Sequence, residues 1–276
     1  VEACSWSNIP DEDFALADDN HWTIGQFVWT GFDYLGEPSP YDTNAWPNHS
    51  SMFGIIDLAS IPKDRYYLYR SVWNKKAETL HILPHWTWPG REGKVTPVFV
   101  YTNHPTAELF INGKSYGKQS KNNSSLKNRY RLMWMNAVYE PGEIKVVAYN
   151  KDGKAVAEKI VRTAGKPHHI ELVSNRNELT ADGKDLAYIT VKVVDKDGNL
   201  CPADSRQINF SVKGAGKYRA AANGDPTNLE QFHLPKMHTF NGMLTAIVQS
   251  GETAGEIVLT AKASGVKAGN IRIQTK

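Results

Sequence analysis

The chain has 276 residues, 41% of them hydrophobic and 22% charged, and a formal net charge of +3. This balance is typical of a globular protein of about two or three domains. The basic residues are scattered, so neither a nucleic-acid partner nor an anionic membrane surface is indicated. No apolar run approaches the ~18–20 residues that cross a bilayer, and the first residues lack the features of a signal peptide.

The first 77 residues predict an α/β segment. Acidic residues in its first turn predict a short helix over 11–19, and aromatic residues at helical spacing predict another over 61–73. Between them, residues 23–33 predict a strand whose apolar centre is typical of burial on both faces. One βα unit cannot bury both faces of its strand. We therefore expect residues 1–77 to be the end of a larger α/β domain.

The run from Gln26 to Tyr41, QFVWTGFDYLGEPSPY, passes from this apolar strand into a loop rich in Gly and Pro. Trp29 either lines a sugar pocket at the strand end or fills a core, and the sequence leaves both open. Asp33 and Glu37 lie four residues apart in a loop, where their carboxyl groups could take the separation of either a retaining or an inverting pair, so the spacing does not identify a catalytic pair. We favour a loop-capping Asp33 and a solvated Glu37, with a sugar-hydroxyl contact as a further role for Asp33.

Residues 78–164 and 165–276 predict two β-sandwiches, because short alternating segments are separated by turn signals. Asn112-Gly113 supplies the positive φ angles of a hairpin turn. The Lys-, Asn- and Ser-rich residues 117–130 predict an exposed loop. The hairpin is expected over 108–116, and single strands over 96–102, 143–149, 155–161, 170–173, 187–194, 207–212, 243–249 and 256–263.

Three further motifs have two interpretations each. Trp46 lies on the long loop and either lines a site or anchors the loop. Trp86 and Trp88 form either a sugar platform or, as we favour, an interface with the preceding domain. Residues 195–199 match a calcium loop only in part, so we predict a turn.

The two cysteines, Cys4 and Cys201, fall in parts of the chain that we assign to different domains. Neither has the spacing or the clustered histidines of a zinc site. We expect two isolated thiols, no metal and no cofactor.

Together these motifs resemble the C-terminal part of a glycoside hydrolase family 2 enzyme of the β-galactosidase type. The resemblance runs in order through essentially the whole chain. Besides the run 26–41 it rests on SMFGIIDLA (51–59), PKDRYYLY (62–69), LPHWTW (83–88), VYTN (100–103), ELFINGK (108–114), PGE (141–143), TADG (180–183), NGDP (223–226) and FNG (240–242).

The resemblance implies a mainly β fold, with two immunoglobulin-like sandwiches after the last βα unit of a (β/α)8 barrel. It implies a parent that is a retaining exo-β-galactosidase whose catalytic glutamates lie upstream of Val1. This chain would then supply no catalytic residue and be inactive alone. Trp29 matches the family tryptophan beside the non-reducing sugar, and Asp33 is carried over as a sugar contact. The chain departs from the common pattern at Gln26, where Glu is frequent.

Two alternatives remain: a non-catalytic carbohydrate-binding or spacer module, and a parent that acts on another β-glycoside such as a glucuronide or mannoside. The expected partner is a carbohydrate, a galactoside in the parent. The exposed flank of the barrel remnant predicts self-association. The resemblance places the parent in the periplasm or outside the cell.

Overall fold

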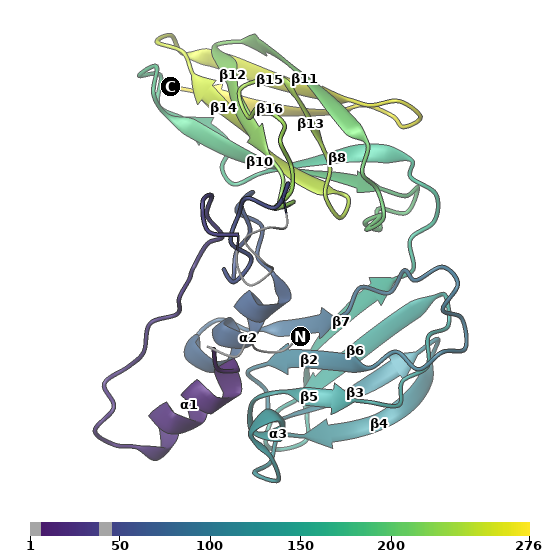
Figure 1. Cartoon of the computed structure of the whole chain (residues 1–276). Coiled ribbons are helices and arrows are strands. Elements are labelled where there is room, and N and C mark those ends of the chain that lie inside the picture. The colour runs from purple at the N-terminus through teal and green to yellow at the C-terminus, as the bar shows by residue number, and fades with distance from the viewer. Residues whose placement is uncertain (1–6, 39–45) are drawn as a thin grey trace. The chain divides into compact units, whose positions relative to one another are not determined.

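The computed structural model describes residues 7–38 and 46–276. Its contacts divide the chain into two compact units. The first consists of Val1–Gly31 and Pro62–Thr163, and the second of Phe32–Ile61 and Ala164–Lys276. Both units consist mainly of antiparallel sheets, as the mainly β prediction requires (Figure 1).

The first unit holds a sandwich of two sheets, which we call the first sandwich. Its sheets have the strand orders β1-β2-β5 and β4-β3-β6-β7. Alternate residues of β6 face inward, so Ile144, Val146 and Ala148 are fully buried. The strands are β1 (Leu80–Leu83), β2 (Val98–Thr102), β3 (Thr106–Ile111), β4 (Lys114–Ser120), β5 (Leu132–Trp134), β6 (Glu143–Tyr149) and β7 (Ala155–Arg162).

Two helices pack on this sandwich and confirm both helix predictions. They are α1 (Pro10–Asp19) and α2 (Asp64–Trp73). Phe14 of α1 is 1% exposed, and its ring centroid lies 5.1 Å from that of Tyr69 and 5.2 Å from that of Tyr130. Burial of these rings therefore joins both helices to the sandwich.

The strand predicted over 23–33 is wrong for this structure. No strand ladder includes these residues within the described ranges, and Phe32 forms only an isolated bridge with Ile56. Ile24 and Phe27 are each 105% exposed. A strand needs neighbours that bond its N–H and C=O groups, which local apolar pattern alone does not supply. The exposure of Ile24 and Phe27 agrees with the expectation that this segment has an apolar flank without partner strands. We call residues 23–33 the exposed run. The barrel itself stays a prediction.

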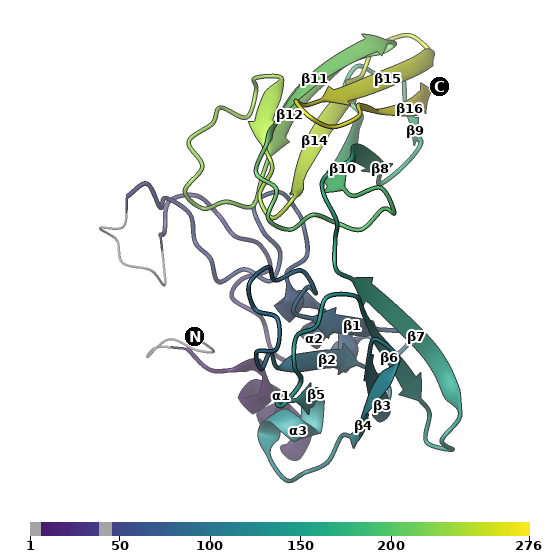
Figure 2. The ribbon, with the colours of Figure 1, turned by 90° about the vertical axis from the view of Figure 1, so that its right-hand side faces the viewer.

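The second unit holds the second sandwich, whose two layers are seen in Figure 2. Its sheets have the orders β12-β14-β10-β8 and β13-β11-β15-β16-β9. Inward-facing residues of both sheets, among them Ile189, Val191 and Leu259, form a fully buried core. The strands are β8 (His169–Ser174), β9 (Glu178–Leu179), β10 (Leu186–Val194), β11 (Gln207–Gly214), β12 (Gly216–Ala222), β13 (Lys236–His238), β14 (Met243–Ser250), β15 (Gly255–Lys262) and β16 (Gly269–Thr275).

The turn predictions are confirmed, and one loop prediction is wrong in part. Asn112 and Gly113 have φ angles of 48° and 80° and join β3 to β4. Residues 195–199 form a turn in which Asp195 N donates to Asn199 O at 2.9 Å. The predicted loop 117–130 instead contains the end of β4 and a short helix, α3 (Leu126–Tyr130), because Ser125 Oγ accepts from Asn128 N at its start.

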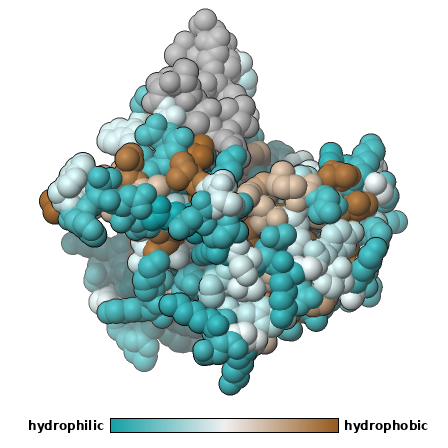
Figure 3. Space-filling view, turned by 90° about the horizontal axis from the view of Figure 1, so that it is seen from below, coloured by the Kyte–Doolittle hydropathy of each residue, from teal (hydrophilic) through white to brown (hydrophobic). Residues whose placement is uncertain are grey.

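The surface drawn in Figure 3 is largely hydrophilic, and its hydrophobic residues form small separate groups. None of the helices in the described ranges is long and apolar enough to cross a membrane.

Candidate functional site

Asp33 lies in the second unit and ties together two described segments, residues 32–38 and 46–61, which we call the site loop. The residue is 7% exposed. Its Oδ1 accepts from Gly54 N at 2.9 Å, and its own N donates to Ile56 O at 2.9 Å. A Cβ at position 54 would lie 2.3 Å from Asp33 N, so only glycine permits this approach. The loop-capping interpretation of Asp33 is therefore confirmed. A sugar contact for Asp33 stays a prediction.

The next residues pair with the far side of the site loop. Tyr34 N donates to Ser51 Oγ at 3.0 Å, and Ser51 N donates to Tyr34 O at 2.9 Å. Gly36 N donates to His49 O at 2.9 Å. The Tyr34 hydroxyl donates to the carboxylate of Glu37, which is exposed. Glu37 is thus the solvated residue that the sequence predicts.

The site loop is seated on the second sandwich at two places. The hydroxyl of Thr245 in β14 donates a hydrogen bond to Ala59 O at 2.6 Å. Thr245 is buried, with 7% of the residue exposed. His49 N donates to Pro226 O at 3.1 Å. Ala59 of the motif 51–59 and Pro226 of the motif 223–226 therefore both take part in seating the site loop within the second unit. Sequence reasoning missed this role, since nothing local marks a residue as a partner of one far along the chain.

Trp29 and Trp46 both expose their indoles. Trp29, in the first unit, is 78% exposed, which is inconsistent with a core residue. Trp46, in the second unit, is 71% exposed, and its ring centroid lies 6.2 Å from that of His49. Within the second unit, the ring of Trp46 lies near that of His49, and Asp33 accepts a hydrogen bond from Gly54. A sugar-lining role for either indole stays a prediction.

Trp86 corrects both interpretations of the Trp86 and Trp88 pair. It is 0% exposed, its ring centroid lies 5.1 Å from that of Tyr139, and its Nε1 donates to Glu140 O at 3.0 Å. It therefore fills the core of the first sandwich rather than a platform or a domain interface. Trp88 stacks on His85 with a centroid distance of 4.1 Å.

Asp195 uses its oxygens to hold its own turn rather than a cation. Burial alone would raise the pKa of its carboxyl. Hydrogen bonds from the Asn199 amide and from the N–H groups of Gly165, Asn199 and Asp197 outweigh burial and lower the pKa to about 2. Within the described ranges, no group of three or more His, Cys, Asp or Glu is arranged to hold a metal.

Cys201 is a buried free thiol. Burial, followed by the nearby charges of Asp195 and Asp204, raises the pKa of this thiol to about 11. It therefore stays protonated near neutral pH and does not serve as a nucleophile. The other predicted isolated thiol, Cys4, lies outside the described residues.

Comparison with known proteins decides the family. Residues 170–272 match the model of the glycoside hydrolase family 2 C-terminal domain 5, and residues 93–157 match a domain of unknown function. Over 98% of its length the chain is 43% identical to a β-galactosidase of Bacteroides ovatus, of which it covers 31%. This chain belongs to glycoside hydrolase family 2.

Another relative and two solved structures are also similar to this chain over most of its length. A β-glucuronidase of Formosa agariphila is 26% identical over 94% of this chain, which covers 26% of that protein. A β-glycosidase structure from Bacteroides vulgatus has a TM-score of 0.87 and 35% identity over 96% of this chain and 33% of that one. A family 2 structure from Bacteroides cellulosilyticus has a TM-score of 0.86 and 32% identity, and this chain covers 38% of it. The chain thus spans roughly a quarter to two fifths of these relatives' lengths.

Proposed function

We propose that this chain is the C-terminal part of a retaining exo-β-galactosidase and that it is inactive alone. The 43% identity to the Bacteroides ovatus β-galactosidase, over 98% of this chain, carries the proposal. The retaining mechanism needs two carboxyl groups, one as nucleophile and one as acid and base. The motif carboxyls are otherwise engaged: Asp33 with the N–H of Gly54, and Glu37 with the hydroxyl of Tyr34.

In the proposed enzyme, the motif residues line the pocket without cutting the bond. The exposed indoles of Trp29 and Trp46 present flat apolar faces on which the C–H groups of a sugar ring pack. Asp33 fixes the site loop and contacts a sugar hydroxyl. Residues 1–77 end the catalytic barrel. The exposed run around Phe27 supports this origin, because a strand without partners leaves its apolar side chains uncovered.

A β-glucuronidase parent is the second candidate, because a Formosa agariphila relative carries that name. A uronate in the pocket needs a cationic group beside its carboxylate. Residues 23–38 contain no Lys or Arg. This favours a neutral terminal sugar. We further propose a periplasmic or extracellular location for the parent, and self-association of the isolated chain through the exposed run.

The test is a panel of aryl β-glycosides assayed with the longer protein that contains this chain. We expect the galactoside to be hydrolysed with the highest kcat/KM, and the glucuronide and mannoside poorly. Trp29→Ala should lower kcat/KM about 10- to 100-fold, since an aromatic contact is worth ~1.5–3 kcal/mol and each 1.4 kcal/mol is a factor of ten. Trp22→Ala is the matched control, because Trp22 is also exposed but lies outside the motif. A parent that prefers the glucuronide overturns the galactoside assignment.

A further inference from the structure

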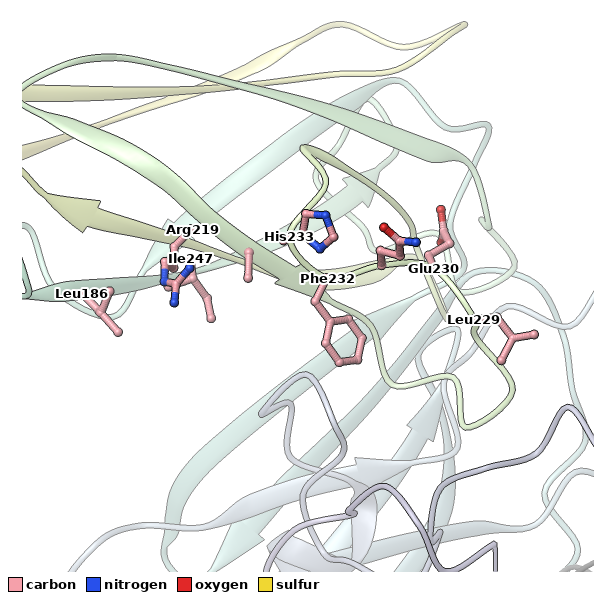
Figure 4. A pocket seen from close by; sticks show the side chains of 9 residues that line it. Leu186, Arg219, Leu229, Glu230, Phe232, His233 and Ile247 are labelled. Carbon is pink, nitrogen blue, oxygen red and sulfur yellow. The ribbon is translucent and has the colours of Figure 1, made fainter.

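A depression of about 650 Å³ lies on the second sandwich, apart from the residues described so far (Figure 4). Its floor is formed by Leu186 of β10, Ala220 of β12 and Ile247 of β14. These residues face outward, because their neighbours Ala187 and Val248 are fully buried in the core. The floor is therefore an apolar part of the outer face of the sheet β12-β14-β10-β8.

One wall of the depression is the loop between β12 and β13, from which Leu229, Phe232 and His233 reach the depression. The backbone of this loop is fixed on the sandwich. Phe232 O accepts from Ala221 N at 2.8 Å, and Leu234 O accepts from the Tyr218 hydroxyl at 2.7 Å. The wall is thus formed in advance, and a ligand would not have to order it.

The depression contains the exposed, positively charged side chain of Arg219. Arg219 lines it and forms no hydrogen bond or ion pair with any described residue. The lining carboxylate, Glu230, is already held by His238: Oε1 lies 2.9 Å from Nδ1, and Oε2 accepts from the His238 backbone N at 2.9 Å. An apolar floor, an exposed phenyl ring and a free guanidinium together favour a ligand with an apolar face and a carboxylate.

The depression shares its sheet face and its wall loop with the seat of the site loop. Thr245, which bonds Ala59 of the site loop, lies two residues before Ile247 on the same face of β14. Pro226, which accepts from His49, begins the stretch that leads to Phe232. This shared position favours a continuation of the substrate over an unrelated peptide.

We propose that this depression is a secondary subsite for an acidic sugar in a glycan whose terminal sugar is a neutral galactoside. The carboxylate of the acidic sugar binds the Arg219 guanidinium, and its C–H face packs on Phe232. The inference rests on the proposed function, because that function identifies the ligand as a glycan. It goes further by assigning the chemical class of the remainder of the substrate.

The test measures binding to the 276-residue chain itself, by isothermal titration calorimetry at low salt. The probes are a tetrasaccharide of alternating glucuronic acid and N-acetylglucosamine, a neutral cellotetraose and a tetraglutamate peptide. We expect the acidic saccharide to bind at least about tenfold more tightly than either other probe. Arg219→Gln should weaken its binding about 10- to 100-fold, as for loss of a hydrogen bond to a charged group. Phe232→Ala should weaken it too, and Lys213→Gln on the exposed surface of β11 should not.

Circular dichroism melting of each variant shows that it is folded. Equal binding of cellotetraose, tighter binding of the peptide, absence of saturable binding or an unaffected Arg219→Gln variant each overturns the proposal. The result is independent of catalysis. Failure to bind, with galactoside hydrolysis by the longer protein intact, defeats the subsite alone. Binding without any galactosidase activity in the longer protein defeats the proposed function instead.

Discussion

Gly54→Ala is expected to separate the two segments of the site loop that Asp33 holds together. The added methyl carbon would lie 2.3 Å from Asp33 N and 2.4 Å from the carbonyl carbon of Phe32. Non-bonded heavy atoms settle at about 3.5 Å or more, so the two backbone segments must separate by about 1 Å. This separation breaks the 2.9 Å bonds from Gly54 N to Asp33 Oδ1 and from Asp33 N to Ile56 O. The loss is about 2–4 kcal/mol, one charged and one neutral hydrogen bond.

Hydrogen exchange followed by mass spectrometry measures this loss directly. Amides within residues 32–61 should exchange about 30- to 1000-fold faster, because 1.4 kcal/mol corresponds to a factor of ten. Exchange in β10 and β14 should stay slow, since their core does not include residue 54. Gly31→Ala is the matched control, because a Cβ there meets nothing within 4 Å. If Gly54→Ala leaves protection of the site loop unchanged, the account of Asp33 as its tie is wrong.

The remaining predictions concern charges in the first unit. Asp11→Ala leaves the guanidinium of Arg131 buried without its carboxylate and should cost about 3–5 kcal/mol in urea unfolding. Asp19→Ala removes one partner of an exposed pair and should cost much less, because solvent screens that pair. Equal losses in the two variants would contradict this. Burial, and then the nearby Lys75, lowers the pKa of Lys121 to about 8 from 10.5. Between these two pH values Lys121 is still protonated in the unfolded chain but deprotonated in the folded chain. The free energy of unfolding should therefore rise from pH 8 to 10.5. Lys121→Met should remove that rise. An unchanged slope in the variant would assign the titration to another group.

Local chemistry made most of the strands predictable. The alternation of Ile144, Val146 and Ala148 gave β6 its bounds, and Asn112-Gly113 located a hairpin because few residues other than Asn and Gly adopt positive φ at low cost. β12 was missed because its end is three alanines, which have weak strand propensity. In β16, by contrast, the alternation of Ile271 and Ile273 is a local signal of a strand.

Partners that lie far along the chain explain what the sequence left open. An apolar run such as 23–33 becomes a strand only beside other strands, and its pattern does not report whether they are present. Trp86 and Trp29 look alike in sequence, yet one is fully buried and the other 78% exposed. The role of Asp33 depended on Gly54, whose close approach leaves no local mark.

The most direct test compares the purified 276-residue chain with the longer protein that contains it, both on 4-nitrophenyl β-galactoside. The account predicts turnover by the longer protein and none by this chain at equal molar concentration, because the proposed function places the catalytic pair outside this chain. Turnover that co-purifies and scales with the 276-residue chain would contradict the account.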